Sequence, residues 1–78
     1  MKAHVNDKVE TLVNVSSDFS NRIIPRGTQG VIVEQYDNPE GYAVDLAIPD
    51  KSLVGGFTFE NVILHPDQFK VVKSAKSS

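Results

Sequence analysis

The side chains that could carry out chemistry are few and widely spaced in this 78-residue chain. His4 and His65 lie near opposite ends of the sequence, so they do not form the closely spaced pair typical of a zinc site. There is no cysteine, which removes disulfides, thiol catalysis and thiolate metal ligands together. The serines lack a recognisable His–carboxylate partner and are interpreted as loop residues. The sequence therefore predicts no catalytic residue, no metal and no cofactor, and we expect a protein that is not an enzyme.

The densest cluster of polar side chains is the segment 37–41, Asp-Asn-Pro-Glu-Gly. Its carboxylates could offer oxygen ligands to calcium, but a calcium loop of the EF-hand type needs a longer alternating array between two helices. Asp and Asn cap their own backbone, Pro fixes φ, and Gly permits a positive φ, so the same residues favour a tight turn. Gly27 and Gly30 are interpreted as a bend rather than a phosphate loop, because no helix is expected after them.

The segments on either side of that turn have the composition of β-strands. Residues 28–36 are rich in β-branched side chains around Val31, Ile32 and Val33. Residues 42–48 alternate with a period of two, which indicates a strand with one face toward a core. That face carries Tyr42, Val44, Leu46 and Ile48. The sequence thus predicts a β-hairpin over residues 28–48.

The remaining segments predict shorter elements arranged around this hairpin. We expect a first strand over 8–15 and a long connection over 16–26. Residues 53–64 are expected to be a strand that bends at Gly55-Gly56, with two short strands as the alternative. One tight helical turn is expected over 65–69, with Phe69 in the core, followed by a short closing strand over 70–73. The core is expected to form around Ile32, Val44, Leu46 and Phe59.

These elements predict an all-β fold, a small five-stranded SH3-like partly open barrel with one short 3-10 turn before the last strand. We expect residues 1–6 to be a flexible N-terminus, residues 7–73 to be the barrel, and residues 74–78 to be a disordered tail. A domain of this size buries only roughly 60% of the surface of its unfolded chain, so we expect modest stability.

Three segments of the chain resemble a known family. Asp-Lys-Val at 7–9, PRGTQGVIVE at 25–34 and QYDNPEGYAVDL at 35–46 resemble small bacterial proteins of unknown function with SH3-like folds, which share a G-T-x-G-x-V-V-E strand and an aromatic hairpin. The resemblance covers about residues 7–72 and implies a small partner of another bacterial protein. The G-T-x-G-x-V segment is also similar to the KOW motif of ribosomal and transcription proteins, and to the small barrel subunits of ferredoxin-thioredoxin reductase and photosystem I.

The expected function is that of a noncatalytic protein-interaction module with an unidentified protein partner. We expect the long first loop and the hairpin tip to border a shared groove, because arginine and aromatic side chains are the usual anchors of interfaces. Alternatively the loop is a lid over the core, the two arginines pair with nearby carboxylates, and the two tyrosines pack across the strands. The candidate partner-binding residues are Phe19, Arg22, Ile23, Ile24, Arg26, Tyr36, Asp37, Glu40 and Tyr42.

Two other functions are open alternatives. A KOW-like nucleic-acid-binding domain would use its basic side chains, but 8 basic and 10 acidic residues give a net charge of -2, which argues against generic binding to phosphates. Five of the basic residues would form the nucleic-acid surface, namely Lys8, Arg22, Arg26, Lys70 and Lys73. A structural homodimer would assemble through the apolar segment 53–59. Without the apolar stretch of a signal peptide or a membrane span, we expect a cytoplasmic protein with no membrane association.

Overall fold

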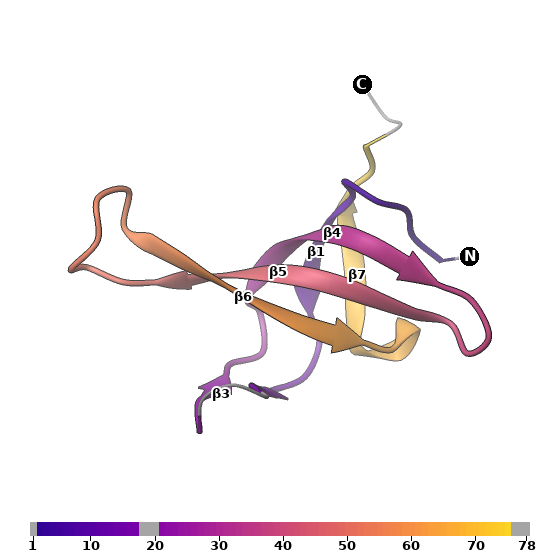
Figure 1. Ribbon diagram of the computed structural model, residues 1–78, viewed down its shortest axis with the longest axis horizontal. Coiled ribbons are helices and arrows are strands. Elements are labelled where there is room, and N and C mark those ends of the chain that lie inside the picture. The colour runs from indigo at the N-terminus through magenta and orange to yellow at the C-terminus, as the bar shows by residue number, and fades with distance from the viewer. Residues whose placement is uncertain (1, 18–20, 76–78) are drawn as a thin grey trace.

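The computed structural model describes residues 2–17 and 21–75, and these residues form strands, turns and one short 3-10 helix (Figure 1). The elements are β1 (Lys8–Thr11), β2 (Val15–Ser16), β3 (Ile23–Ile24), β4 (Gln29–Tyr36), β5 (Gly41–Pro49), β6 (Phe57–Leu64), η1 (Pro66–Gln68) and β7 (Phe69–Lys73). The predicted all-β class is confirmed, and so are the 3-10 turn and the closing strand after it. In the described ranges we find no helix with the length and apolar character needed to cross a membrane.

The larger sheet has five antiparallel strands in the order β6-β5-β4-β1-β7. β4 is shared, because its first residues pair with β1 and its residues from Gly30 to Tyr36 pair with β5. The two short strands β2 and β3 pair only with each other in a separate ribbon within the described part of the chain. β6 and β7 are the two edges of the larger sheet, and the described strands do not close into a barrel.

The core lies on one face of the larger sheet, as the period of two predicts. Buried side chains come from every strand of that sheet and include Ile32, Val44, Leu46 and Phe69, as expected from the sequence. The full core cluster is Ala3, Val9, Val15, Ile24, Ile32, Tyr42, Val44, Leu46, Val62, Leu64 and Phe69, with Ile48 and Val71 packed against it.

The expected place of Phe59 in this core is wrong, since its side chain is 66% exposed. β6 pairs with β5 without a register shift, and in this register Leu46 is opposite Glu60 while Ala47 is opposite Phe59. Residues directly opposite each other point to the same side of a sheet. Phe59 therefore shares the side of Ala47, away from the core residue Leu46.

The double glycine at 55–56 is part of a turn rather than a bend within a strand. β5 continues to Pro49 and β6 begins only at Phe57, so Gly55 and Gly56 belong to the connection between them. Their φ angles of 91° and 77° are conformations that glycine adopts readily. The N–H of Asp50 donates to the carbonyl of Gly56 at 2.8 Å, which closes the turn.

The expected first strand over 8–15 is divided in two, because Thr11 ends β1 at a junction with β4. The N–H groups of Gly27 and Thr28 both donate to the Thr11 hydroxyl, at 3.1 and 3.2 Å. The backbone of Thr11 is bonded there as well, since its N–H donates to the carbonyl of Thr28 at 2.9 Å. The chain then leaves the sheet and resumes as β2 at Val15.

Gly30 allows β4 and β5 to approach closely. A Cβ atom at this position would lie 2.5 Å from the carbonyl oxygen of Asp45 and 2.9 Å from a methyl group of Leu46. Further along, the register with β5 shifts between Ile32 and Glu34, which leaves Val33 as the extra residue of a bulge. The close approach at Gly30 is one of the reasons for which glycine occurs within a strand, whereas the bulge lies at Val33 and involves no glycine.

The segments before β1 and after β7 lie side by side. Asp7 is buried, and its carboxylate accepts the N–H of His4 at 2.9 Å and the N–H of Ala75 at 2.8 Å. Ala3 belongs to the core cluster. Residues 2–6, part of the N-terminus expected to be flexible, therefore pack against the rest of the domain, while residues 76–78 of the expected tail lie outside the described residues.

Candidate functional site

The long connection over residues 16–26 places only some of the expected partner-binding residues on the surface. Arg22 and Arg26 are exposed, and Ile23 is 60% exposed. Ile24 is a core residue, because the alternation along β3 turns it inward when Ile23 points outward. We therefore remove Ile24 from the candidate surface, and Phe19 lies outside the described residues.

The hairpin tip holds two candidate residues that serve the fold. Tyr42 is fully buried, and its hydroxyl donates to a carboxylate oxygen of Glu40 and accepts the N–H of Ala3 at 3.3 Å. The same oxygen of Glu40 accepts the N–H of Lys2 at 3.0 Å. These contacts hold the N-terminal segment against the sheet, so Glu40 and Tyr42 are also removed from the candidate surface.

The pKa values of Glu40 and Tyr42 are shifted by these hydrogen bonds and by burial. The hydrogen bond from Tyr42, together with the one from the Lys2 backbone, lowers the pKa of Glu40. Burial raises the pKa of Tyr42, and the neighbouring Glu40 carboxylate raises it further. A buried neutral phenol beside a charged carboxylate is the form that this arrangement stabilises.

Tyr36 and Asp37 remain on the surface at the hairpin tip. Tyr36 is 41% exposed, and its hydroxyl donates to Glu34 at 3.2 Å, a bond that raises the pKa of Tyr36. Asp37 is exposed in the turn that follows β4. Neither residue lines any of the hollows described below.

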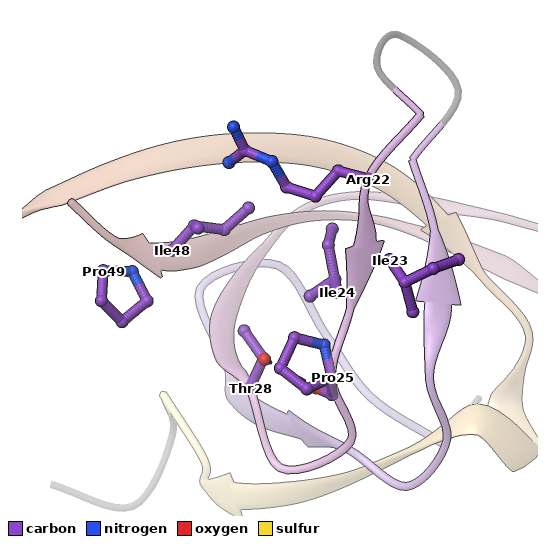
Figure 2. Close-up of a pocket in the computed structure, with 7 residues that line it drawn as sticks. All are labelled: Arg22, Ile23, Ile24, Pro25, Thr28, Ile48 and Pro49. Atoms are coloured by element: carbon purple, nitrogen blue, oxygen red, sulfur yellow. Dashed lines mark hydrogen bonds between the residues drawn. The ribbon is translucent and has the colours of Figure 1, made fainter.

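The loop and the hairpin tip do not border a shared groove. Arg22 lies beside the C-terminal end of β5, where it lines a hollow with Ile48 and Pro49 (Figure 2). The hairpin tip is at the other end of β5, six residues and about 20 Å from Ile48 along an extended strand. In Figure 1 the β2–β3 ribbon is accordingly at the lower left and the β4–β5 turn at the far right.

The hollow beside Arg22 is the first of three that continue across the sheet. It is lined by Arg22, Ile23, Ile24, Pro25, Thr28, Ile48 and Pro49. A second hollow shares Pro25, Thr28 and Pro49 with it and adds Arg26 and Phe57. A third shares Gln29 and Ala47 with the second and reaches Lys8, Val31 and Phe59.

The second and third hollows lie on the side of the larger sheet that faces away from the core. We call this side the outer face and define it by Val31, Ala47, Phe57, Phe59 and Ile63. Phe57, Phe59 and Ile63 are each more than half exposed, in contrast to the buried residues that alternate with them toward the end of β6. The outer face therefore exposes apolar side chains, which Asn61 and Asp45 interrupt between Phe59 and Ile63.

Cations border the outer face. Lys8, Arg22 and Arg26 line the three hollows, and no described acidic residue lines any of them. Asp45 lies on the same side of the sheet, where its carboxylate accepts a hydrogen bond from the Asn61 side chain at 2.8 Å. The cations that line the hollows thus have Asp45 and Asp50 as acidic neighbours outside them, and the pKa of the Asp50 carboxyl is lowered by hydrogen bonds from Ser52 and further by Arg22.

This surface offers apolar contact, aromatic rings and positive charge to a ligand. Within residues 2–17 and 21–75, no three histidine, aspartate or glutamate side chains gather where they could hold a metal ion. No family model, curated protein or solved structure matches the chain. The sequence signal for the outer face is the pair Phe57 and Phe59, which the spacing places on one side of a strand.

Proposed function

We propose that this chain is a noncatalytic protein-interaction module, the small partner of another protein, and that it binds this protein through the outer face. The observation that supports the proposal is the exposure of Phe57, Phe59 and Ile63 together on one side of β6. Contiguous apolar surface rimmed by polar groups is typical of protein-interaction sites. Large aromatic side chains are also the residues that contribute most to the affinity of such sites.

For the scaffold we propose an SH3-like, partly open barrel. The strand order β6-β5-β4-β1-β7, the long connection between β1 and β4, and the 3-10 turn directly before β7 support this arrangement. Such a scaffold places the β2–β3 ribbon beside the sheet and leaves the outer face of β4, β5 and β6 available to a partner.

The charges around the outer face indicate what kind of partner segment would fit. Lys8 and Arg26 line its two hollows, in which no described acidic residue takes part, and Arg22 lines the adjoining hollow. A complementary segment would place apolar side chains on Phe57 and Phe59 and carboxylates opposite these cations. We therefore propose an extended apolar peptide segment flanked by acidic residues.

A second candidate function, the binding of single-stranded nucleic acid, is favoured by the cations and aromatic rings that line the same hollows. Arg26 and Phe57 line one hollow, and Lys8 and Phe59 line the next. Proteins that bind single-stranded nucleic acid use this combination, in which bases stack on aromatic rings while cations contact the phosphates. The net charge of -2 argues for the protein partner as the first choice.

A selection from a displayed peptide library tests the first function. We expect the selected peptides to be apolar in the middle and acidic at the flanks, and to lose about tenfold or more in affinity for the Phe57→Ala/Phe59→Ala variant. Val54→Ala is the matched control, because Val54 is exposed on the turn before β6 and lies outside the outer face. Peptides that bind the double variant as tightly as the unaltered chain would show that this choice of surface is wrong.

Salt dependence and aromatic replacement separate the two functions. Single-stranded oligonucleotides would bind at low salt and lose affinity steeply by about 200 mM salt, since phosphate contacts release counterions. Phe57→Leu/Phe59→Leu keeps apolar contact and removes the aromatic rings, so it would weaken oligonucleotide binding more than peptide binding. Oligonucleotide binding with both properties, and no peptide selected, would favour the second function.

A further inference from the structure

β6 (Phe57–Leu64) is an edge of the larger sheet that carries little to prevent pairing with another strand. It pairs with β5 through eight residue pairs with no register shift, from Tyr42↔Leu64 to Pro49↔Phe57. Alternate backbone N–H and C=O groups therefore point outward from a regular strand. Natural edge strands are commonly protected by lysine, proline, a bulge or an inward-pointing charge, and β6 contains only the last of these, Glu60.

Glu60, near the middle of β6, has an oxygen atom without a partner. Its side chain is on the same side of the sheet as Leu46, the core residue directly opposite. The Oε2 atom of Glu60 is buried and accepts no hydrogen bond from the described residues. A buried polar atom without a hydrogen bond is unfavourable, so a donor brought to this edge would stabilise it.

We propose that β6 pairs antiparallel with β6 of a second copy of this chain, about a two-fold axis at Phe59. This pairing extends the sheet across the dimer and gives each Glu60 a donor, the hydroxyl of Thr58 in the other copy. It goes beyond the proposed function, because it uses the backbone edge of β6; of the outer face it involves Phe59, whose rings from the two copies would lie side by side.

The register follows from which residues can be opposite each other. In a continuous sheet, opposite residues point to the same side, so the two-fold axis must pass through a single residue position of β6. An axis at Glu60 would place the two carboxylates directly opposite each other, which is unfavourable. An axis at Thr58 would place Glu60 opposite Gly56, which has no side chain to donate.

The other registers along β6 do not place a hydrogen-bond donor opposite the Glu60 carboxylate. An axis at Asn61 or at Val62 would place an apolar side chain opposite the carboxylate, either Val62 or Leu64 of the second copy. The axis at Phe59 instead places Thr58 opposite Glu60, and it does so twice because the contact is symmetric. It also places the two Phe59 rings opposite each other, with Cβ atoms about 5 Å apart, and aromatic cross-strand pairs are favourable.

The oligomeric state of the full chain tests the contact. Light scattering and sedimentation from about 5 to about 500 μM should show a species of twice the chain mass of 8.6 kDa. Phe59→Lys would place like charges opposite each other, so we expect its dimer dissociation constant to rise by ~10-fold or more. Val72→Lys is the matched control at the other edge of the sheet, where Val72 is 42% exposed, and it should leave the dimer unchanged. A chain that remains at 8.6 kDa throughout would overturn the proposal.

Single cysteines test the register, because the chain contains none of its own. Phe59→Cys places the two thiols opposite each other, near the Cβ separation that a disulfide requires, and should give a disulfide-linked dimer under mild oxidation. Asn61→Cys lies on the same side of β6 but opposite Phe57 of the second copy, so it should cross-link far more slowly. Faster cross-linking through Asn61→Cys than through Phe59→Cys would contradict the axis at Phe59.

A variant on the core side of β6 separates this inference from the proposed function. Thr58→Val removes the hydroxyl that would donate to Glu60 and lies outside the outer face. It should weaken the dimer by ~10-fold and leave peptide affinity unchanged. Loss of peptide binding in Phe57→Ala/Phe59→Ala with no effect of Thr58→Val on the dimer would support the function and contradict the dimer contact.

Discussion

The rings of Tyr42 and Phe69 meet edge to face, with their centroids 5.2 Å apart and their planes at 82°. The contact joins the start of β5 to the start of β7, two strands that are not neighbours in the sheet. The ammonium group of Lys2 lies 4.6 Å from the centre of the Phe69 ring and donates to the carbonyl oxygens of Pro66 and Phe69. Core packing and attachment of the N-terminal segment therefore depend on the same few side chains.

Tyr42→Phe should reduce the free energy of unfolding by about 1–2 kcal/mol, because the ring is retained while the bonds to Glu40 and Ala3 are lost. Urea unfolding followed by circular dichroism measures the change. Tyr36→Phe is the control, since it removes only an exposed bond to Glu34 and should change stability by less than about 0.5 kcal/mol. Equal effects of the two substitutions would contradict the role assigned to Tyr42.

Stability should fall on the acid side, in part through Glu40. Its pKa in the folded chain lies below the ordinary value of 4.5, so it stabilises the fold above that pH and loses this contribution as the pH falls through the lowered pKa. We expect the urea midpoint to decrease as the pH falls below 4.5, and to decrease less in Glu40→Gln. An identical decrease in the variant would show that another carboxylate is responsible.

Tyr42 should have the opposite effect at high pH. Burial raises its pKa above the ordinary value of 10.0, so its stabilising contribution is complete below that pH and is lost as the pH rises through the raised value. Tyr42→Phe cannot ionise there, and its urea midpoint should therefore vary less with alkaline pH than that of the unaltered chain. Spectrophotometric titration of tyrosine absorbance provides an independent measurement of the raised pKa.

Gly30→Ala should destabilise the fold by about 1–3 kcal/mol or more, since the new methyl group would lie 2.5 Å from the backbone oxygen of Asp45. Gly41→Ala is the matched control in the adjacent strand, where the nearest atoms are 3.8 Å away. That variant should be close to neutral. Thermal and urea unfolding of both variants would show whether the close approach of β4 and β5 requires glycine.

Phe59→Ala should change the free energy of unfolding of the monomer by less than about 0.5 kcal/mol, because its side chain is largely exposed. Leu46→Ala on the buried side of the neighbouring strand should cost about 2–5 kcal/mol. Unfolding of the two variants should be compared at protein concentrations where the chain is monomeric, so that dimer formation does not contribute to the measured stability. A large loss in Phe59→Ala would mean that Phe59 is part of the core after all.

The hairpin and its turn were predictable from the sequence because local signals agree there. Alternation from Tyr42 to Ile48 identifies the buried side of β5, and the residues of the Asp-Asn-Pro-Glu-Gly segment strongly favour a turn. Phe69 was predictable for a similar reason, since it follows a proline-initiated turn and precedes a short strand.

The outer face was not predictable, because β6 carries apolar residues on both sides. Phe57, Phe59 and Ile63 alternate with Val62 and Leu64, so the pattern alone does not say which set is buried. The register with β5 decides this, and it depends on where the turn after Pro49 ends. The contacts of Lys2 and Ala3 were not predictable, because the N-terminal segment before β1 is too short to show a hydrophobic periodicity.

The carboxylate of Asp7 accepts hydrogen bonds from His4 on one side and from Ala75 on the other, which brings two segments far apart in the sequence together. A short linker could therefore join these segments, and the chain could be opened instead at the exposed turn between β5 and β6. A circularly permuted protein of this kind would keep every strand pair of the sheet. It would also begin its chain next to β6, where a label or a tethered peptide could be attached beside the outer face.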